Sequence, residues 1–187
     1  HGFKEAYDGT IEEGDLFLTT DPYACNGAIS HINDWLLLRP IFKDGRLIAY
    51  AAMFGHMTDV GGKVPGSLPT DARESFEEGI RVPPLKIFKN DELQTDVLNL
   101  ILHNSRMPTW NRSDFNALVA AMRTAEKRVI EMAERFGDDE YYSALDELLA
   151  RNKRAMGKLI KDTVPTKKQY FEDYICDDGL GMGPYRI

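Results

Sequence analysis

Two runs of strand-forming residues, 35–42 and 47–54, are separated by the polar stretch Lys43-Asp44-Gly45-Arg46. An Asp-Gly pair readily adopts the positive φ angles that a two-residue hairpin loop requires. The pattern therefore predicts a β-hairpin with Asp44 and Gly45 as its loop. Counting back from Lys43 opposite Arg46 in an unbroken ladder places Asn33 opposite His56 and Asp34 opposite Gly55.

Shorter patterns predict the other strands and the first helix. Alternation favours a strand over 14–19, a small second hairpin over 85–93, and strands at 169–175 and 185–187. Apolar residues at helical spacing predict a helix from Thr95 to His103. The segment 67–78 is expected to be a short helix or irregular.

The longest helical pattern follows a capping residue, Ser113 or Asp114, and runs to Phe136, where Gly137 ends it. A second apolar stripe continues to Ile160, and the short linker predicts an antiparallel helical hairpin. We expect an α+β fold: a hairpin-rich sheet region carrying the site (1–112), a helical hairpin (113–162) that forms core or an interface, and the start of a further sheet (163–187).

Two polar clusters, one before the first strand of this hairpin and one after its second strand, carry the candidate chemistry, and the hairpin brings them together at one end. His31 and Asp34 precede its first strand, and His56 ends its second strand. Two imidazoles and one carboxylate suit a divalent metal such as Mn, Fe or Zn, with positions left open for substrate. An unbroken ladder would point Asp34 and His56 to opposite faces, so a bulge or a strand end is required nearby, and Pro40 or Gly55 could provide one. The alternative is that both histidines only hydrogen-bond the backbone.

The motifs around these residues resemble the hydantoinase B/oxoprolinase family, and their order continues along nearly the whole chain. The phrases Ala24-Cys25-Asn26 and Ser30-His31-Ile32-Asn33-Asp34-Trp35 look most like the large, metal-bearing subunit of the ATP-dependent acetone and acetophenone carboxylases. The motifs that carry the family resemblance are 14–23, His31-x-x-Asp34, His56-x-x-Asp59-x-Gly61-Gly62, Pro65-Gly66-Ser67, 77–84, 96–102, Asn104-x-Arg106-x-Pro108, 171–173, 177–179 and Gly183-Pro184.

By position, the resemblance implies that His31, Asp34 and His56 hold a divalent metal, Mn²⁺ before Zn²⁺ or Fe²⁺. It implies a C–C bond-forming carboxylase that joins a ketone to bicarbonate. A hydantoinase A-like partner would use ATP, and a small third subunit would complete the hetero-oligomer. Gly55, where much of the family has a second histidine, favours a carboxylase over the alternative, an ATP-dependent hydrolase of cyclic amides. The third alternative is a non-catalytic scaffold.

Further polar residues are candidates for the surroundings of the site. Asp59 is expected to accept a hydrogen bond from a metal-bound imidazole. Glu78, Arg81 and Arg106 are candidates for facing the site, the arginines because a guanidinium binds carboxylate or phosphate through two bonds. Cys25 is a minor candidate for a nucleophile. Asp21 is expected to cap its loop, with orientation of an imidazole as the alternative. The alternatives for Asp59 are a fourth metal ligand or a turn former, and the alternative for each arginine is a structural ion pair.

Composition narrows the functional classes. The 187 residues carry a net charge of −7, which argues against nucleic acid or an anionic membrane as partner. The chain has no Walker-type phosphate loop, so ATP is expected on a partner subunit. Two well-separated cysteines and no long apolar run favour a reduced, cytoplasmic setting. Because family members are several times longer, the chain is expected to be a segment of a larger subunit.

Overall fold

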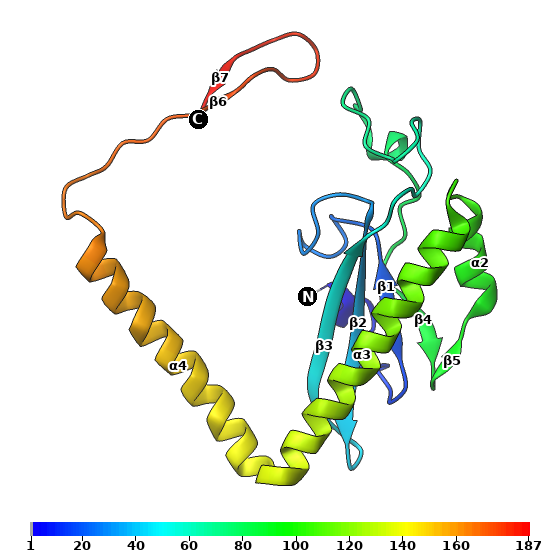
Figure 1. Cartoon of the computed structure of the whole chain (residues 1–187), viewed down its shortest axis with the longest axis vertical. Helices are drawn as coiled ribbons and strands as arrows, with labels where there is room; N and C mark the ends of the chain where they lie inside the picture. Colours follow the sequence, from blue (N-terminus) through cyan, green and yellow to red (C-terminus); the bar gives the residue numbers. More distant parts are fainter. Residues whose placement is uncertain (1) are drawn as a thin grey trace. The chain divides into compact units, whose positions relative to one another are not determined.

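The computed structural model describes residues 2–187 (Figure 1). The chain divides into two compact units, the first ending at Ile130 and the second comprising Glu131–Ile187. The fold is α+β, as the sequence predicts: a five-stranded sheet, two long helices and a small two-stranded sheet follow one another along the chain.

The first unit is built on an antiparallel sheet with the strand order β3-β2-β1-β4-β5. Both predicted hairpins are present, and each turns through two residues with positive φ: Asp44-Gly45 and Asn90-Asp91. The bounds are β1 Leu16–Thr19, β2 Asp34–Lys43, β3 Arg46–His56, β4 Leu85–Lys89 and β5 Glu92–Leu93.

The predicted register of the main hairpin is wrong beyond its first pairs. Lys43 faces Arg46 and Phe42 faces Leu47, but Ile41 faces Ala49, so Ile48 is an extra residue in β3. This bulge shifts every later pair by one position and places Asp34 opposite His56. It lies beside the turn, at neither Pro40 nor Gly55.

Apolar side chains cover both faces of the sheet. On one face, the larger core joins Trp35 and Leu37 of β2 to helix residues that include Leu98 and Phe115. On the other face, Leu36 packs with a smaller cluster from α1 (Gly2–Ala6) and from the loop after β1. β2 is therefore buried on both faces, and its central residues read as a continuous apolar run.

Helix α2 (Thr95–His103) has the predicted bounds, but the next helix begins earlier than expected. Helix α3 runs from Pro108 to Phe136. Pro108 can begin the helix because the N–H that proline lacks would have no intrahelical partner in the first turn. Gly137, with φ of 87°, separates α3 from α4 (Asp138–Thr163). The short 3-10 helix η1 (Ser75–Glu77) lies in the otherwise irregular 67–78 segment.

The strands of the second unit are shorter than predicted. β6 is Tyr174–Ile175 and β7 is Tyr185–Arg186, and the two pair only with each other. Residues 169–173 lie outside β6, although Asp173 and Ile187 exchange backbone hydrogen bonds beyond its end. None of the helices in the described part of the chain is long and apolar enough to cross a membrane.

Candidate metal centre

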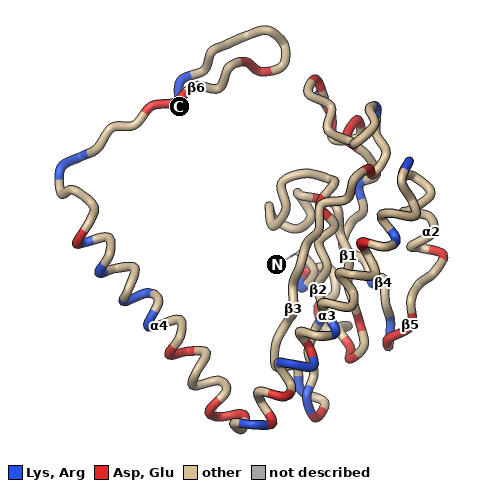
Figure 2. The backbone as a smooth tube through the Cα atoms, in the orientation of Figure 1, with Lys and Arg blue, Asp and Glu red and all other residues tan. Residues whose placement is uncertain are grey.

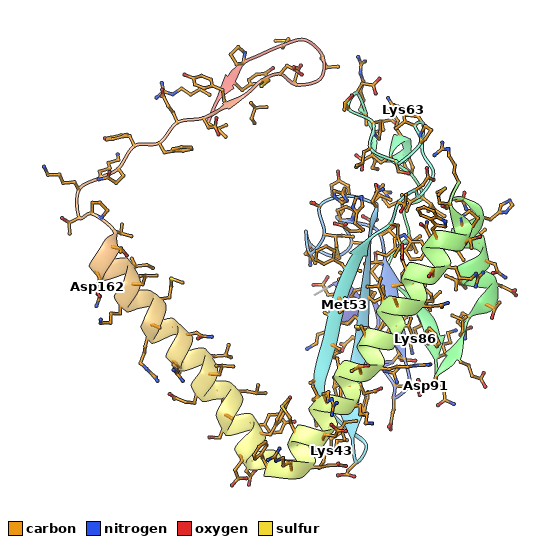
Figure 3. The ribbon with its side chains drawn as sticks, in the orientation of Figure 1. Lys43, Met53, Lys63, Lys86, Asp91 and Asp162 are labelled. Atoms are coloured by element: carbon orange, nitrogen blue, oxygen red, sulfur yellow. The ribbon has the colours of Figure 1, made fainter. Side chains whose placement is uncertain are left out.

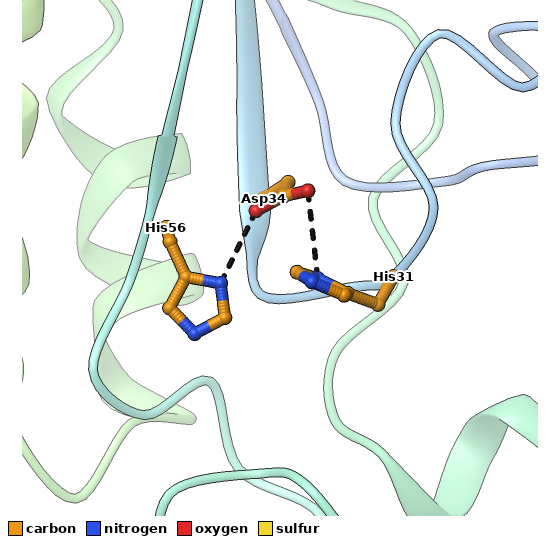
Figure 4. A group of neighbouring side chains, drawn as sticks. All are labelled: His31, Asp34 and His56. Carbon is orange, nitrogen blue, oxygen red and sulfur yellow. Dashed lines mark hydrogen bonds and ion pairs between the residues drawn. The ribbon is translucent and has the colours of Figure 1, made fainter.

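The three predicted ligands meet at one end of the β2–β3 hairpin (Figure 4). His31 lies in the turn before β2, Asp34 is the first residue of β2 and His56 is the last residue of β3. Each residue offers one potential ligand atom, and these three atoms lie within 4.8 Å of one another. Among residues 2–187, this is the only such group of three or more His, Cys, Asp or Glu residues.

The carboxylate of Asp34 lies between the two imidazoles. Its Oδ1 is 3.2 Å from His56 Nδ1 and its Oδ2 is 3.5 Å from His31 Nδ1. The imidazole rings meet edge to face, with centroids 4.9 Å apart. The Asp34 side chain is 8% exposed, whereas those of His31 and His56 are 35% and 46% exposed. The cluster is therefore closed on the carboxylate side and accessible from the imidazole side.

A second observation, independent of the distances between the three ligand atoms, supports binding of a divalent cation. His31 Nδ1 is buried and makes no hydrogen bond in the described structure, although Asp34 Oδ2 lies 3.5 Å away. A buried polar atom without a partner is costly unless something binds it. A cation with neutral imidazole and carboxylate ligands would satisfy this nitrogen and offset the charge of Asp34.

Asn33 holds the loop of His31 against the end of β3. The backbone N–H of Met57 donates to Asn33 O at 2.8 Å. The Asn33 amide Nδ2 in turn donates to Met57 O at 3.1 Å and to Gly66 O at 3.2 Å. Asn33 is completely buried, so these bonds are shielded from water. They fix the distance between the two chain segments that carry the candidate ligands.

Asp59 has a different role from the one predicted. Its carboxylate accepts backbone hydrogen bonds from Gly61, Gly66 and Arg106, and it pairs with the Arg106 guanidinium at 2.9 Å. Burial by itself would raise the pKa of Asp59, but these hydrogen bonds outweigh it and lower the pKa to about 2. Asp59 organises the loop after His56 and bonds to no imidazole.

The two candidate arginines are also occupied by structural contacts. Arg106 donates to the carbonyl oxygens of Gly61, Gly62 and Val64 in addition to Asp59. Arg81 pairs with Asp21 Oδ2 at 3.3 Å and lies over the ring of Phe76.

The candidate residues in the loop between β1 and β2 make structural contacts. Asp21 Oδ1 accepts the backbone N–H groups of Tyr23 and Ala24, which is loop capping. Cys25 is a free, buried thiol directed at Pro22 O. Glu78 directly follows the 3-10 helix as its C-cap, and a role for it at the site stays a prediction.

Gly55 faces away from the candidate metal ligands. Side chains alternate along a strand, so position 55 lies on the opposite face from His56. A Cβ atom at Gly55 would lie 3.0 Å from Leu118 Cδ1 on helix α3. Close packing against α3 explains the glycine at this position.

The sequence did not reveal two features that shape the site, the role of Asn33 and the position of the expected bulge, which lies at Ile48. Asn33 had a detectable signal, because a polar residue directly before a buried strand needs buried partners. The bulge had none, because Leu47, Ile48 and Ala49 are all compatible with a regular strand.

Comparison with known proteins places the fold and the site in context. The chain is 36% identical to the caprolactamase subunit beta of Pseudomonas jessenii over 95% of its own length and 30% of that subunit. It is 33% identical to the acetophenone carboxylase delta subunit of Aromatoleum aromaticum over 72% of its length and 19% of that subunit. The chain thus spans less than a third of these relatives.

A solved structure has the same fold. The crystal structure of the ATP-dependent caprolactamase from Pseudomonas jessenii matches with a TM-score of 0.81 and 32% identity, covering 94% of this chain and 29% of that one. The hydantoinase B/oxoprolinase family model matches residues 2–187. Relatives in this family are named as subunits of ATP-dependent enzymes that include amide hydrolases and carboxylases. From the fold, the site and these matches together, we conclude that this chain belongs to the hydantoinase B/oxoprolinase family.

Proposed function

We propose that this chain is the metal-bearing part of a subunit of an ATP-dependent enzyme that opens a cyclic amide. The observation that carries the proposal is the convergence of His31, Asp34 and His56 within 4.8 Å at an accessible strand end. The match to caprolactamase over 95% of the chain supports the choice of a lactam or related cyclic amide as substrate class. The relatives named hydantoinase and 5-oxoprolinase support the same class.

The residues of the chain have separable roles in this proposal. A divalent cation, when bound, supplies Lewis acidity that polarises a substrate or water oxygen. His31 and His56 provide neutral nitrogen ligands, and Asp34 provides the anionic oxygen. The exposed sides of the two imidazoles leave room for substrate. Asn33 positions the His31 loop through its bonds to Met57 and Gly66.

Carboxylation of a ketone with bicarbonate is the second candidate function. It is supported by the match to the acetophenone carboxylase delta subunit and by a 26% identical acetone carboxylase structure with a TM-score of 0.68. The phrases around Cys25 and His31 resemble these carboxylases as well. We do not use Gly55 to choose between the two functions, because this position faces helix α3 and not the candidate metal centre.

Both candidate functions require a divalent metal and an ATP-using partner subunit. We propose Mn²⁺ as the metal, because a mixed nitrogen and oxygen set with open positions suits it, with Zn²⁺ next. A hydantoinase A-like subunit would use ATP, and a small third subunit is expected for the carboxylase. That relatives are named as subunits beta, delta and B supports an assembly of several chains.

Product analysis of the intact complex tests the proposal. The complex is incubated with ATP and either caprolactam, hydantoin or 5-oxoproline, or with acetone or acetophenone plus ¹³C-bicarbonate. We expect the ring-opened carboxylate from a cyclic amide, which is an amino acid from caprolactam or 5-oxoproline and N-carbamoylglycine from hydantoin, and no ¹³C in product. Labelled β-keto acid from a ketone alone would overturn the first candidate and establish the second. Normal turnover by a His56→Ala complex that lacks metal would contradict both and favour a scaffold.

A further inference from the structure

The β2–β3 hairpin carries Asp34 and His56 on one of its two faces. Because side chains alternate along a strand, every second residue counted from these two lies on the same face. Four such residues line a hollow with a volume of about 270 Å³: Leu36, Leu38, Tyr50 and Ala52. Figure 3 labels Met53, the residue that follows Ala52 in β3. The volume lies just below the usual range of small-molecule pockets, so the hollow suits a small ring.

Two short stretches of chain connect the hollow to the candidate metal centre. Leu36 lies two residues after Asp34, which along a strand corresponds to about 7 Å. On the other side, Ala28 lines the hollow three residues before His31, a span of at most about 10 Å. A molecule with one end at the metal centre therefore needs to be only about 7 Å long to enter the hollow.

The hollow is built within the first compact unit. All its walls come from residues 2–52, so none of them depends on where residues 131–187 lie. Phe3, Cys25 and Leu36 line it and also belong to the smaller core cluster, in which each of them is buried. Close packing in this cluster therefore fixes much of the shape of the hollow.

The walls of the hollow are chiefly apolar. The described lining residues include no acidic side chain, and Lys4 is the only charged one. Its ammonium lies 5.2 Å from the centre of the Tyr50 ring. The Cys25 thiol donates to Pro22 O, so this polar group already has a partner. Figure 2 shows β3 in tan between its ends, which agrees with the lack of charge along this wall. Such a surface favours the hydrocarbon part of a ligand.

We propose that this hollow binds the methylene chain of an unsubstituted lactam whose amide carbonyl lies at the candidate metal centre. The inference rests on the proposed function, because it takes the substrate to be a cyclic amide. 5-Oxoproline carries a carboxylate on its ring, and hydantoin carries a second carbonyl and a second N–H. Entry of these groups into the hollow would cost their hydration, with Lys4 as the one charged partner. Leu36, Leu38 and Ala52 thus make the subunit selective for a hydrocarbon ring.

Matched substrates test this selectivity in the intact complex with ATP. 2-Pyrrolidone and 5-oxoproline share a five-membered ring and differ only in a carboxylate, whereas caprolactam adds two methylenes to 2-pyrrolidone. We expect kcat/KM to rise at least about tenfold from 2-pyrrolidone to caprolactam, because each buried methylene contributes roughly fourfold. We expect it to fall from 2-pyrrolidone to 5-oxoproline.

The same substrates separate failure of this inference from failure of the proposed function. A kcat/KM for 5-oxoproline or hydantoin that equals or exceeds that for 2-pyrrolidone would overturn the apolar hollow and leave the cyclic-amide function intact. Equal values for 2-pyrrolidone and caprolactam would do the same. Turnover of no cyclic amide would overturn both.

Filling the hollow tests where the methylene chain lies. Ala52→Leu adds a larger apolar side chain to the wall, and Ala52→Ser, at the same position, is the matched control. We expect Ala52→Leu to lower kcat/KM for caprolactam at least about tenfold more than that for 2-pyrrolidone, mainly through KM, with the metal content unchanged. Ala52→Ser should keep the wild-type ratio. An unchanged ratio in Ala52→Leu would contradict the proposal. If Ala52→Leu loses metal, the ratio in the smaller variant Ala52→Val decides in the same way.

Discussion

Asp34 lies directly opposite His56 in the β2–β3 ladder, and its Oδ1 is 3.2 Å from the His56 Nδ1. A two-residue turn followed by a regular ladder would have placed Gly55 there. The extra residue Ile48 shifts the pairing by one, and a one-residue shift exchanges the two faces of a strand. A bulge near the turn thus determines which side chains meet seven pairs away.

Replacement of the candidate ligands should abolish tight metal binding. We expect Asp34→Ala and His56→Ala each to lower the affinity for Mn²⁺ at least about tenfold, because even residues that only support ligands commonly have effects of that size. Metal analysis after dialysis and calorimetric titration of the full-length subunit measure this. His103→Ala is the control, since His103 is an exposed histidine at the end of α2. Unchanged metal content in both ligand variants would refute the site.

Substitution at Gly55 should affect packing and leave the metal site unchanged. In Gly55→Ala, the new Cβ would lie 3.0 Å from Leu118 Cδ1, and we expect a loss of about 1 kcal/mol in unfolding free energy. The loss should disappear when Leu118 is also replaced by Ala, as denaturant titration of the four proteins would show. Gly55→His should bind the same number of metal ions as the wild type. A second bound ion would show that position 55 reaches the site.

Stability should depend on pH through Asp59. Its pKa in the folded protein is about 2, below the ordinary value of 3.8, so its carboxylate stabilises the fold above pH 3.8, and the contribution is lost as the pH falls toward 2. Asp59→Asn should therefore cost roughly 2 kcal/mol at neutral pH and much less near pH 2. Urea unfolding across this range measures the difference. Asp71→Asn, at an exposed carboxylate paired with Lys63, should cost clearly less, because solvent screens an exposed ion pair. Equal losses in the two variants would argue against the Asp59 network.

Two glycines of the loop after His56 should respond unequally to alanine. At Gly62 a Cβ would overlap Glu77 O and lie 2.6 Å from the Glu78 carbonyl carbon, whereas at Gly66 it would meet nothing within 4 Å. Both glycines have positive φ, near 80°. Gly66→Ala therefore reports the backbone strain alone, about 1–2 kcal/mol, and Gly62→Ala should lose clearly more. Thermal unfolding compares them, and similar midpoints would mean that the loop can open at Gly62.

The sequence by itself determined the local elements and the chemistry available. The Asp44-Gly45 turn, the α2 bounds and the break at Gly137 follow from residues next to one another, because turn geometry and helix ends depend on local backbone preferences. The order of separated motifs along the chain also indicated the hydantoinase B/oxoprolinase family. His31, Asp34 and His56 could be named together because a hairpin returns the chain to the place where it began.

Only the tertiary structure decided how these residues face one another. The bulge at Ile48 is visible only in the pairing of β2 with β3, which aligns residues that lie on two separate strands. Trp35 and Leu37 of β2 enter one core and Leu36 the other. The roles of Asp59 and Gly55 likewise depend on partners 47 and 63 positions away, Arg106 and Leu118. Packing between distant segments selects one register and one set of partners from several that local preferences allow equally.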